Sequence, residues 1–353
     1  MNLCSNLRRS THIGLLAMLT TATGCGIGIE PLMPTPVIYA ESGFDPLDHI
    51  PETERWIPRR IFYATVRERS RNLQRIDYGN TPSESVSVGM ALVGFGGPDL
   101  TWSTLEDIST RPDRPEAVTL SIAGIMEKGR FDPADPPSIS GGPHAAGFML
   151  ENMRDVIDDA RDKDVLIYVH GAKVNFYNAC AFAAQLDHFM GRDMTSVAFS
   201  WPTHQNIVSY VFGDDLQRSY DSGEALAAFI DLIASETDAE KIHVLSWSAG
   251  ARVAMTGLAA LHDRYPEESP EQLRSRFRLG TVYFAAGDAP ASEFLAHIDD
   301  IHALADQLVV SQTDHDNALN ASTSFIGGGR RIGQEDLGLS PEQERHVSEL
   351  DRF

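Results

Sequence analysis

Positive charge is scarce in this sequence of 353 residues. It contains 29 Lys and Arg residues against 50 Asp and Glu residues, which gives a formal net charge of −21. A surface with so large an acidic excess repels a nucleic-acid backbone and the face of an anionic membrane. We therefore expect no nucleic-acid partner and interpret the acidic surface as a source of solubility.

Cysteine is also rare, with only Cys4, Cys25 and Cys180 present. Cys4 lies in an expected leader peptide and Cys25 at its end, so Cys180 would remain alone in the mature chain. A single cysteine excludes an intrachain disulfide. Because Cys180 lies among apolar residues at helical spacing, we expect a buried, unreactive thiol and no cysteine nucleophile.

Long hydrophobic runs are absent as well. The apolar run at 13–19 follows Arg8 and Arg9 and is too short to cross a bilayer core of about 30 Å, but it is typical of an export signal. The letters ATGC that end at Cys25 resemble the bacterial lipoprotein processing box. We therefore expect a signal peptide at 1–24 and a lipid on Cys25 that holds an exported protein on a membrane of the cell envelope. Free secretion and a retained signal are the alternatives.

The composition changes along the chain divide it into segments. Residues 25–57 are rich in Gly and Pro and predict an extended tether, followed by one folded domain at 58–353. Within that domain, three alternating runs predict a β-rich part at 58–130. A linker is expected at 131–143, and the core at 144–353.

The core alternates short apolar runs with amphipathic segments. Five runs are expected to form strands: VLIYVH (165–170), TSVAFS (195–200), IHVLSW (242–247), GTVYFAA (280–286) and QLVVS (307–311). Runs that are apolar throughout are typical of strands buried on both faces. The pattern predicts an α/β fold, with a mostly parallel sheet covered by helices on both faces. Ligands in such sheets bind beyond the carboxyl ends of the strands.

Ser248 lies where an expected strand becomes a helix, in the segment VLSWSAGARVA. A nucleophile at such a sharp turn needs small neighbours two residues away, and Ser246 and Gly250 meet that need. Ala249 would lie at the amino terminus of the following helix, where its free N–H would face a developing oxyanion. The alternative is a serine that merely caps the helix.

A second loop follows the strand that ends at His170 and Gly171. Gly171 allows close backbone approach, and the Ala172 N–H would supply the second oxyanion donor. We expect His170 to shape this loop rather than to act as the base.

Three further residues follow the next expected strand. Trp201 either borders an acyl pocket or packs at the end of the strand. Asp214 and Asp215 are expected to cap the helix that follows them.

Several longer motifs carry a family resemblance. They are YVHGAKVNFYNACAFAAQL, AFSWPTHQNIVSYVFGDD, HVLSWSAGARVAMTGLAAL, DNALNAS and GGGRRIG. Together they resemble a family of bacterial α/β hydrolases of largely unassigned function, often exported or lipid-anchored, over roughly residues 31 to 350. The resemblance implies an esterase-like or lipase-like fold with Ser248 as nucleophile. The family's elbow usually reads H-S-M-G, so Trp247 and Ala249 depart from it.

The catalytic acid is expected after a later strand. The order of a hydrolase triad and the DNAL motif favour Asp316, with Asp288 as the alternative and Asp314 as a lesser third candidate. Any of these can instead belong to a turn or a helix cap. The triplet DHD at 314–316 is too weak a metal pattern without a second cluster, so we expect no metal and no other cofactor.

The catalytic histidine is not identified by the sequence. In proteins of this kind it follows the last strand. No such strand is apparent before Phe353, so we expect it to be missing from this sequence. His315 and His346 are weak candidates, since His346 lies in an acidic segment typical of an exposed helix. Without a base, a serine hydroxyl is a weak nucleophile.

Two functions therefore stay open. The first is a serine hydrolase, similar to a carboxylester hydrolase, that acts on a small-molecule or lipid-like acyl substrate. Acyl transfer to an acceptor other than water would use the same nucleophile. The second is a non-catalytic, lipid-anchored binding or scaffold protein that keeps the hydrolase fold. The sequence does not indicate an oligomeric state.

Overall fold

The computed structural model describes residues 30–71, 76–114, 117–134, 147–313, 319, 323 and 326–350. The expected signal peptide and Cys25 lie outside these residues. The described residues form one nine-stranded sheet in the order β1-β4-β3-β2-β6-β5-β7-β8-β9. Its strands are β1 Glu30–Pro31, β2 Arg59–Arg69, β3 Tyr78–Phe95, β4 Thr119–Phe131, β5 Val165–Val169, β6 Thr195–Ser200, β7 Ile242–Trp247, β8 Leu279–Ala285 and β9 Ala305–Val310.

The sheet has an antiparallel part and a parallel part. Strands β1 to β4 pair antiparallel to one another, and β2 then joins β6 in parallel. The remaining pairs, from β6 through β5, β7 and β8 to β9, are all parallel. This is the mostly parallel α/β sheet with a β-rich N-terminal extension that the sequence predicts. Strand β4 includes Phe131, the first residue of the expected linker, and residues 135–143 of that linker lie outside the described residues.

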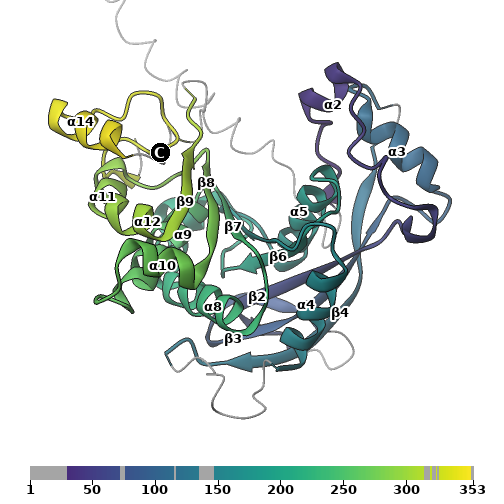
Figure 1. Ribbon diagram of the computed structural model, residues 1–353, viewed down its shortest axis with the longest axis horizontal. Helices are drawn as coiled ribbons and strands as arrows, with labels where there is room; N and C mark the ends of the chain where they lie inside the picture. The colour runs from purple at the N-terminus through teal and green to yellow at the C-terminus, as the bar shows by residue number, and fades with distance from the viewer. Residues whose placement is uncertain are drawn as a thin grey trace, which may run out of the picture.

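Helices cover both faces of the sheet (Figure 1). One face packs against α4 Gly147–Asp159, α8 Gly223–Glu236, α9 Gly250–Asp263, α10 Pro270–Phe277 and α12 Ile298–Leu304. The other face packs against α5 Phe176–Phe189, with α3 Trp102–Thr110 beside it. Shorter or peripheral elements are α2 Val37–Ser42, the 3₁₀ helix η1 Glu52–Glu54, α6 Ile207–Phe212, α7 Asp215–Asp221, α11 Ala291–Ala296 and α14 Pro341–Glu349.

The alternation of side chains along a strand explains why two cores form. On β2, Phe62 points into the core under α4 and α8, whereas its neighbours Ile61 and Tyr63 point into the core under α5. Helix α8 carries an apolar stripe that is fully buried in the first core, and its members are Leu226, Phe229, Ile230 and Ile233. Strands β5 and β6 are buried at every position, so they are fixed from both faces, whereas β7, β8 and β9 also contain partly exposed residues.

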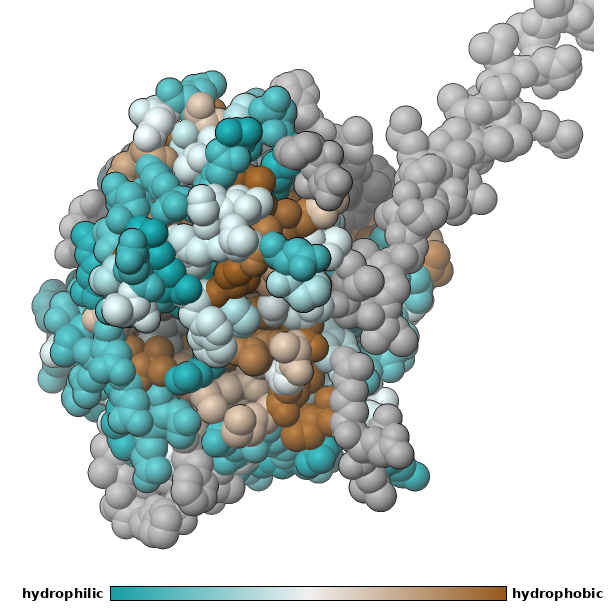
Figure 2. Space-filling model, turned by 90° about the vertical axis from the view of Figure 1, so that its right-hand side faces the viewer, coloured by the Kyte–Doolittle hydropathy of each residue, from teal (hydrophilic) through white to brown (hydrophobic). Residues whose placement is uncertain are grey.

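The segment expected to be an extended tether is partly folded where the structure describes it. It contains β1, α2 and η1, and Leu47 is fully buried. Val37, Ile38 and Phe44 of this segment are exposed, as is Met126 on β4. Figure 2 shows the face at this end of the molecule, where apolar surface gathers in the centre between hydrophilic margins. None of the helices in the described part of the chain is both long and apolar enough to span a bilayer.

Candidate active site

Ser248 occupies a strained turn between β7 and α9. Its φ is +52°, in the left-handed region that costs a residue with a Cβ about 1 to 3 kcal/mol. Three backbone hydrogen bonds hold the turn. The Ser248 N–H donates to the Ala285 carbonyl over 3.0 Å, and the Ser248 carbonyl accepts from the Asp288 N–H over 2.9 Å and from the Ala251 N–H over 3.0 Å. The serine side chain is half-buried. The chain therefore keeps an alcohol in an unfavourable backbone conformation at the carboxyl end of a central strand.

The small residues on either side of Ser248 are required by close packing. A Cβ at Gly250 would lie 2.5 Å from the Val169 carbonyl oxygen, so α9 begins directly against the end of β5. Ser246 is fully buried, and its hydroxyl donates to the Tyr283 carbonyl over 3.3 Å. A larger side chain at either position would push the turn away from the sheet.

The loop after β5 lies against the serine turn. A Cβ at Gly171 would be 3.1 Å from the Trp247 carbonyl oxygen and 3.2 Å from the Ser248 Cβ. Ala172 follows in this loop, and Ala249 lies at the N-terminus of α9, where the first backbone N–H groups have no acceptor within the helix. The structure thus brings together Gly171, Ser248 and the helix N-terminus. This is the arrangement in which two backbone N–H groups can stabilise an oxyanion.

His170 is fully buried beneath this loop. Its Nδ1 lies 2.7 Å from the Gly171 carbonyl oxygen, so Nδ1 carries the proton and donates it, while Nε2 lies 3.4 Å from the Arg67 guanidinium. Burial, together with the charge of Arg67, lowers the pKa of His170 to about 3. Trp201 stacks on the ring at 5.3 Å, is itself fully buried, and donates from Nε1 to the His170 carbonyl over 2.7 Å. Both residues therefore brace the loop from below, and Trp201 does not face an open pocket.

Asp288 lies next to the serine turn, but its carboxylate is already engaged. One oxygen accepts from the Tyr210 hydroxyl over 2.6 Å, and the other accepts from Arg331 Nε over 2.8 Å. Arg252 approaches the second oxygen to 3.8 Å. The carboxylate is thus a buried tie between the loops around the serine turn, and its role as the alternative acid stays a prediction. Asp314, His315 and Asp316 lie outside the described residues.

A sequence model of the family described as "alpha/beta hydrolase of unknown function (DUF900)" matches residues 148–350, more than half of the chain. The chain belongs to this family. The match confirms the resemblance drawn from the motifs and agrees with the observed fold. No curated protein matches the chain.

This member of the alpha/beta hydrolase family contains a histidine and aspartate pair that the sequence did not reveal. After β6, His204 Nδ1 lies 2.7 Å from the buried carboxylate of Asp215, which also accepts from the His204 N–H over 2.8 Å. The expected capping role of this acidic pair is wrong, because Asp214 at the N-cap of α7 makes no capping hydrogen bond and Asp215 bonds His204 and Thr203 instead. The only available signal was a Thr-His dipeptide directly after an expected strand.

Among the residues that the structure describes, none forms a hydrogen bond with the Ser248 hydroxyl. His346 lies on α14, half-exposed, and its Nε2 is 2.9 Å from Asp299. Neither of two cavities formed by described residues, of about 640 and 210 Å³, has Ser248 in its lining. Among the described residues, the Ser248 turn lies beside Gly171 and the N-terminus of α9, and no histidine forms a hydrogen bond with the serine hydroxyl.

Proposed function

We propose that the protein is a serine hydrolase that acts on an ester or similar acyl substrate, with Ser248 as its nucleophile. The observation that carries this proposal is the φ of +52° at Ser248, between a buried strand and a helix. A serine that merely caps a helix has ordinary extended backbone, as Ser269 does at the start of α10 with a φ of −72°. Strain of this kind persists where the surroundings enforce it, which is common at active sites.

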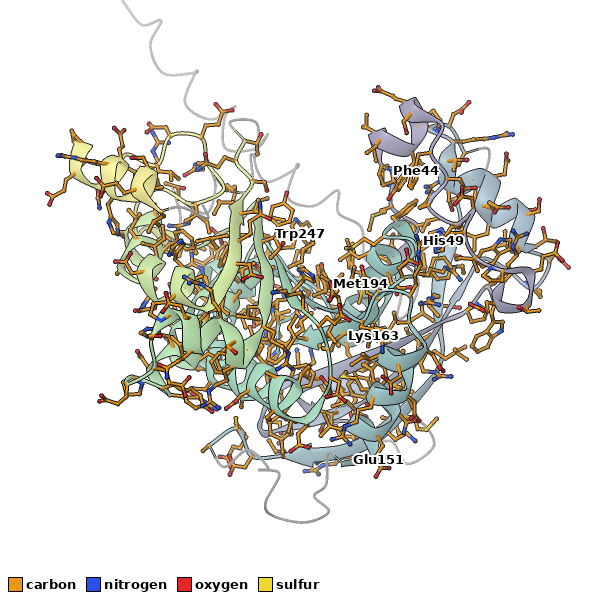
Figure 3. All side chains as sticks on the ribbon, in the orientation of Figure 1. Phe44, His49, Glu151, Lys163, Met194 and Trp247 are labelled. Carbon is orange, nitrogen blue, oxygen red and sulfur yellow. The ribbon has the colours of Figure 1, made fainter. Side chains whose placement is uncertain are left out.

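The proposed chemistry follows from the positions of the groups. The Ser248 Oγ attacks the acyl carbonyl while a base takes its proton, and the Ala172 and Ala249 N–H groups hold the oxyanion. Collapse of this intermediate releases the alcohol of the substrate, and water then hydrolyses the acyl-enzyme. Trp247, the residue before Ser248, is labelled in Figure 3. Its exposed ring lies 5.8 Å from the ring of Phe182 on α5 and offers an apolar surface. That surface suits the apolar part of an acyl substrate.

Two sets of residues are candidates for the rest of the triad. The family resemblance favours Asp316 as the acid, with a histidine that the motifs do not identify. We also consider His204, whose Nδ1 is held by Asp215 and whose Nε2 has no hydrogen-bond partner among the described residues; its ring makes no hydrogen bond with Ser248 in this structure. A base oriented by a carboxylate in this way is the arrangement that activates a serine.

Fluorophosphonate labelling tests the proposal, because the probe reacts with activated serines. We expect the wild-type protein to be labelled, Ser248→Ala to be unlabelled, and the control Ser246→Ala, two residues away and buried, to keep labelling. Persistent labelling of a folded Ser248→Ala variant would assign the reaction to another residue and reject Ser248 as the nucleophile.

A non-catalytic binding or scaffold protein is the second candidate. It is favoured by the lack of any hydrogen bond between the Ser248 hydroxyl and a described residue. A wild-type protein that is folded, as judged by circular dichroism and cooperative unfolding, yet resists the probe would support this function and overturn the first.

We also propose that the protein is exported and held on a membrane by a lipid on Cys25. The apolar run and the small residues before Cys25 support this location. Metabolic labelling with a tritiated fatty acid should mark the wild type but not Cys25→Ala. The control Cys180→Ala should still be marked, because the Cys180 thiol is buried in the fold. Incorporation that survives Cys25→Ala would refute the anchor.

A further inference from the structure

Three metal-ligating side chains converge where α9 ends beside the start of α12. His262 Nδ1 lies 3.5 Å from Asp300 Oδ1 and 3.6 Å from Asp263 Oδ1. All three ligand atoms lie within 4.8 Å of one another. His297 adds a fourth group, since its Nδ1 is 3.7 Å from the other oxygen of Asp300. The two helices pack against each other, so the cluster belongs to a rigid part of the fold.

The His262 nitrogen is in an unusual state. The Nδ1 atom of His262 is shielded from solvent and has no hydrogen-bond partner among the described residues, although the side chain as a whole is 27% exposed and two carboxylates lie beside it. Elsewhere in the same protein, His49 Nε2 lies 2.6 Å from Asp193 and His204 Nδ1 lies 2.7 Å from Asp215, which are ordinary hydrogen bonds. A buried nitrogen without a partner costs free energy. The spacing around His262 is therefore not that of a proton shared between a ring and a carboxylate.

The spacing instead matches ligands around one ion. Nitrogen and oxygen ligands about 2.0 to 2.2 Å from a tetrahedral Zn²⁺ lie about 3.4 Å from each other. The observed separations of 3.5 and 3.6 Å are close to this value. Negative charge also accumulates at the site, because Asp263 ends α9, where the helix dipole is negative. The adjacent Arg264 contacts Glu224 and Asp231 and so directs its charge elsewhere.

We propose that His262, Asp263 and Asp300 bind a divalent transition-metal ion of the Zn²⁺ class, with His297 or water completing the coordination. An imidazole ligand among carboxylates favours Zn²⁺ over Mg²⁺ or Ca²⁺, which take oxygen ligands. Helix α9 has 14 residues and starts two residues after Ser248, so the ion lies about 20 Å from the nucleophile. It therefore stabilises the packing of α9 against α12 and takes no part in the chemistry at Ser248.

Zinc binding by the full-length protein tests this site. The protein is stripped with a chelator and titrated with Zn²⁺ against a chromophoric competitor, while thermal unfolding is followed with and without the ion. We expect the wild type to bind one equivalent of Zn²⁺ more than His262→Ala, and to show a rise in Tm on zinc addition that this variant lacks. Mg²⁺ should produce neither effect.

Matched variants make the result decisive. Two substitutions keep the side-chain shape and should each weaken zinc binding at this site at least tenfold: Asp300→Asn and Asp263→Asn. Because Asp263 is 79% exposed, its substitution leaves the fold intact. His49→Ala removes a partly exposed histidine that already bonds Asp193, and it should keep the wild-type stoichiometry. Equal stoichiometry and equal Tm shifts in the wild type and all three site variants would overturn the proposal.

Discussion

The Asp288 N–H donates to the Ser248 carbonyl oxygen over 2.9 Å, while the Asp288 carboxylate pairs with the buried Arg331. The loop after β8 is thereby fastened to the Ser248 turn at one end and to the C-terminal segment at the other. Arg252, from the first turns of α9, lies 3.8 Å from the same carboxylate. A single buried acid thus joins three segments that surround Ser248.

We expect Asp288→Asn to destabilise the protein by about 3 to 5 kcal/mol, because it leaves buried arginine charge without its counter-ion. Urea unfolding measures the change. The control Asp306→Asn removes a half-exposed partner of Lys241 and should cost at most about 1 kcal/mol. If Asp288→Asn lowers the free energy of unfolding no more than the control does, the Asp288 carboxylate does not hold these segments together.

The close approach of α9 to β5 predicts a second effect. Gly250→Ala places a Cβ 2.5 Å from the Val169 carbonyl oxygen and 2.6 Å from that of His170. Backbone atoms cannot yield as a flexible side chain does, so we expect a loss of about 1 to 3 kcal/mol or more and a displaced serine turn with little fluorophosphonate labelling. The control Gly124→Ala, whose Cβ would meet nothing within 4 Å, should keep both stability and labelling. Wild-type labelling of Gly250→Ala would contradict this account of the elbow.

The buried histidines predict a loss of stability in acid. Burial and Arg67 lower the pKa of His170 to about 3, and burial with three nearby arginines lowers that of His188. An unfolded histidine has a pKa of about 6.5, so the unfolded state binds the proton first as the pH falls. Each neutral, buried histidine therefore contributes its full share of the free energy of unfolding above about pH 6.5. This contribution is lost as the pH falls toward the folded-state pKa, by up to about 1.4 kcal/mol per pH unit for each residue.

Urea unfolding between about pH 5 and pH 8 measures this slope. The variant His170→Asn cannot take up the proton and should show a shallower fall in stability with acid than the wild type. The exposed His346→Asn serves as the control and should follow the wild-type slope. Parallel slopes in His170→Asn and the wild type would show that His170 is already able to ionise in the folded state.

Much of the core could be predicted because its signals are local. Strand β5 is apolar at every position, and the stripe on α8 repeats at helical spacing, so each element can be identified without its partners. The sequence signal for the turn at Ser248 is also local, because so sharp a turn needs small residues at 246 and 250.

The features that the sequence did not reveal depend on contacts between distant segments. Asp288 meets arginines from α9 and from residue 331, and no periodicity records such a meeting. Leu47 is buried although it lies in a segment rich in Gly and Pro, because tertiary packing rather than local pattern orders that segment. His204 and Asp215 are eleven residues apart, and they meet because the chain turns back toward the end of β6 after α6.

That pair supplies the test of the catalytic base. If His204 is the base, His204→Ala should slow fluorophosphonate labelling of Ser248 by about 10² to 10⁴, because the serine would lose the group that takes its proton. Asp215→Asn should slow it as well, since the ring would lose the carboxylate that fixes its tautomer. His346→Ala is the matched control, because its ring also bonds an aspartate but lies on the exposed helix α14. Labelling of His204→Ala at the wild-type rate, with labelling still dependent on Ser248, would move the base to a histidine outside this pair.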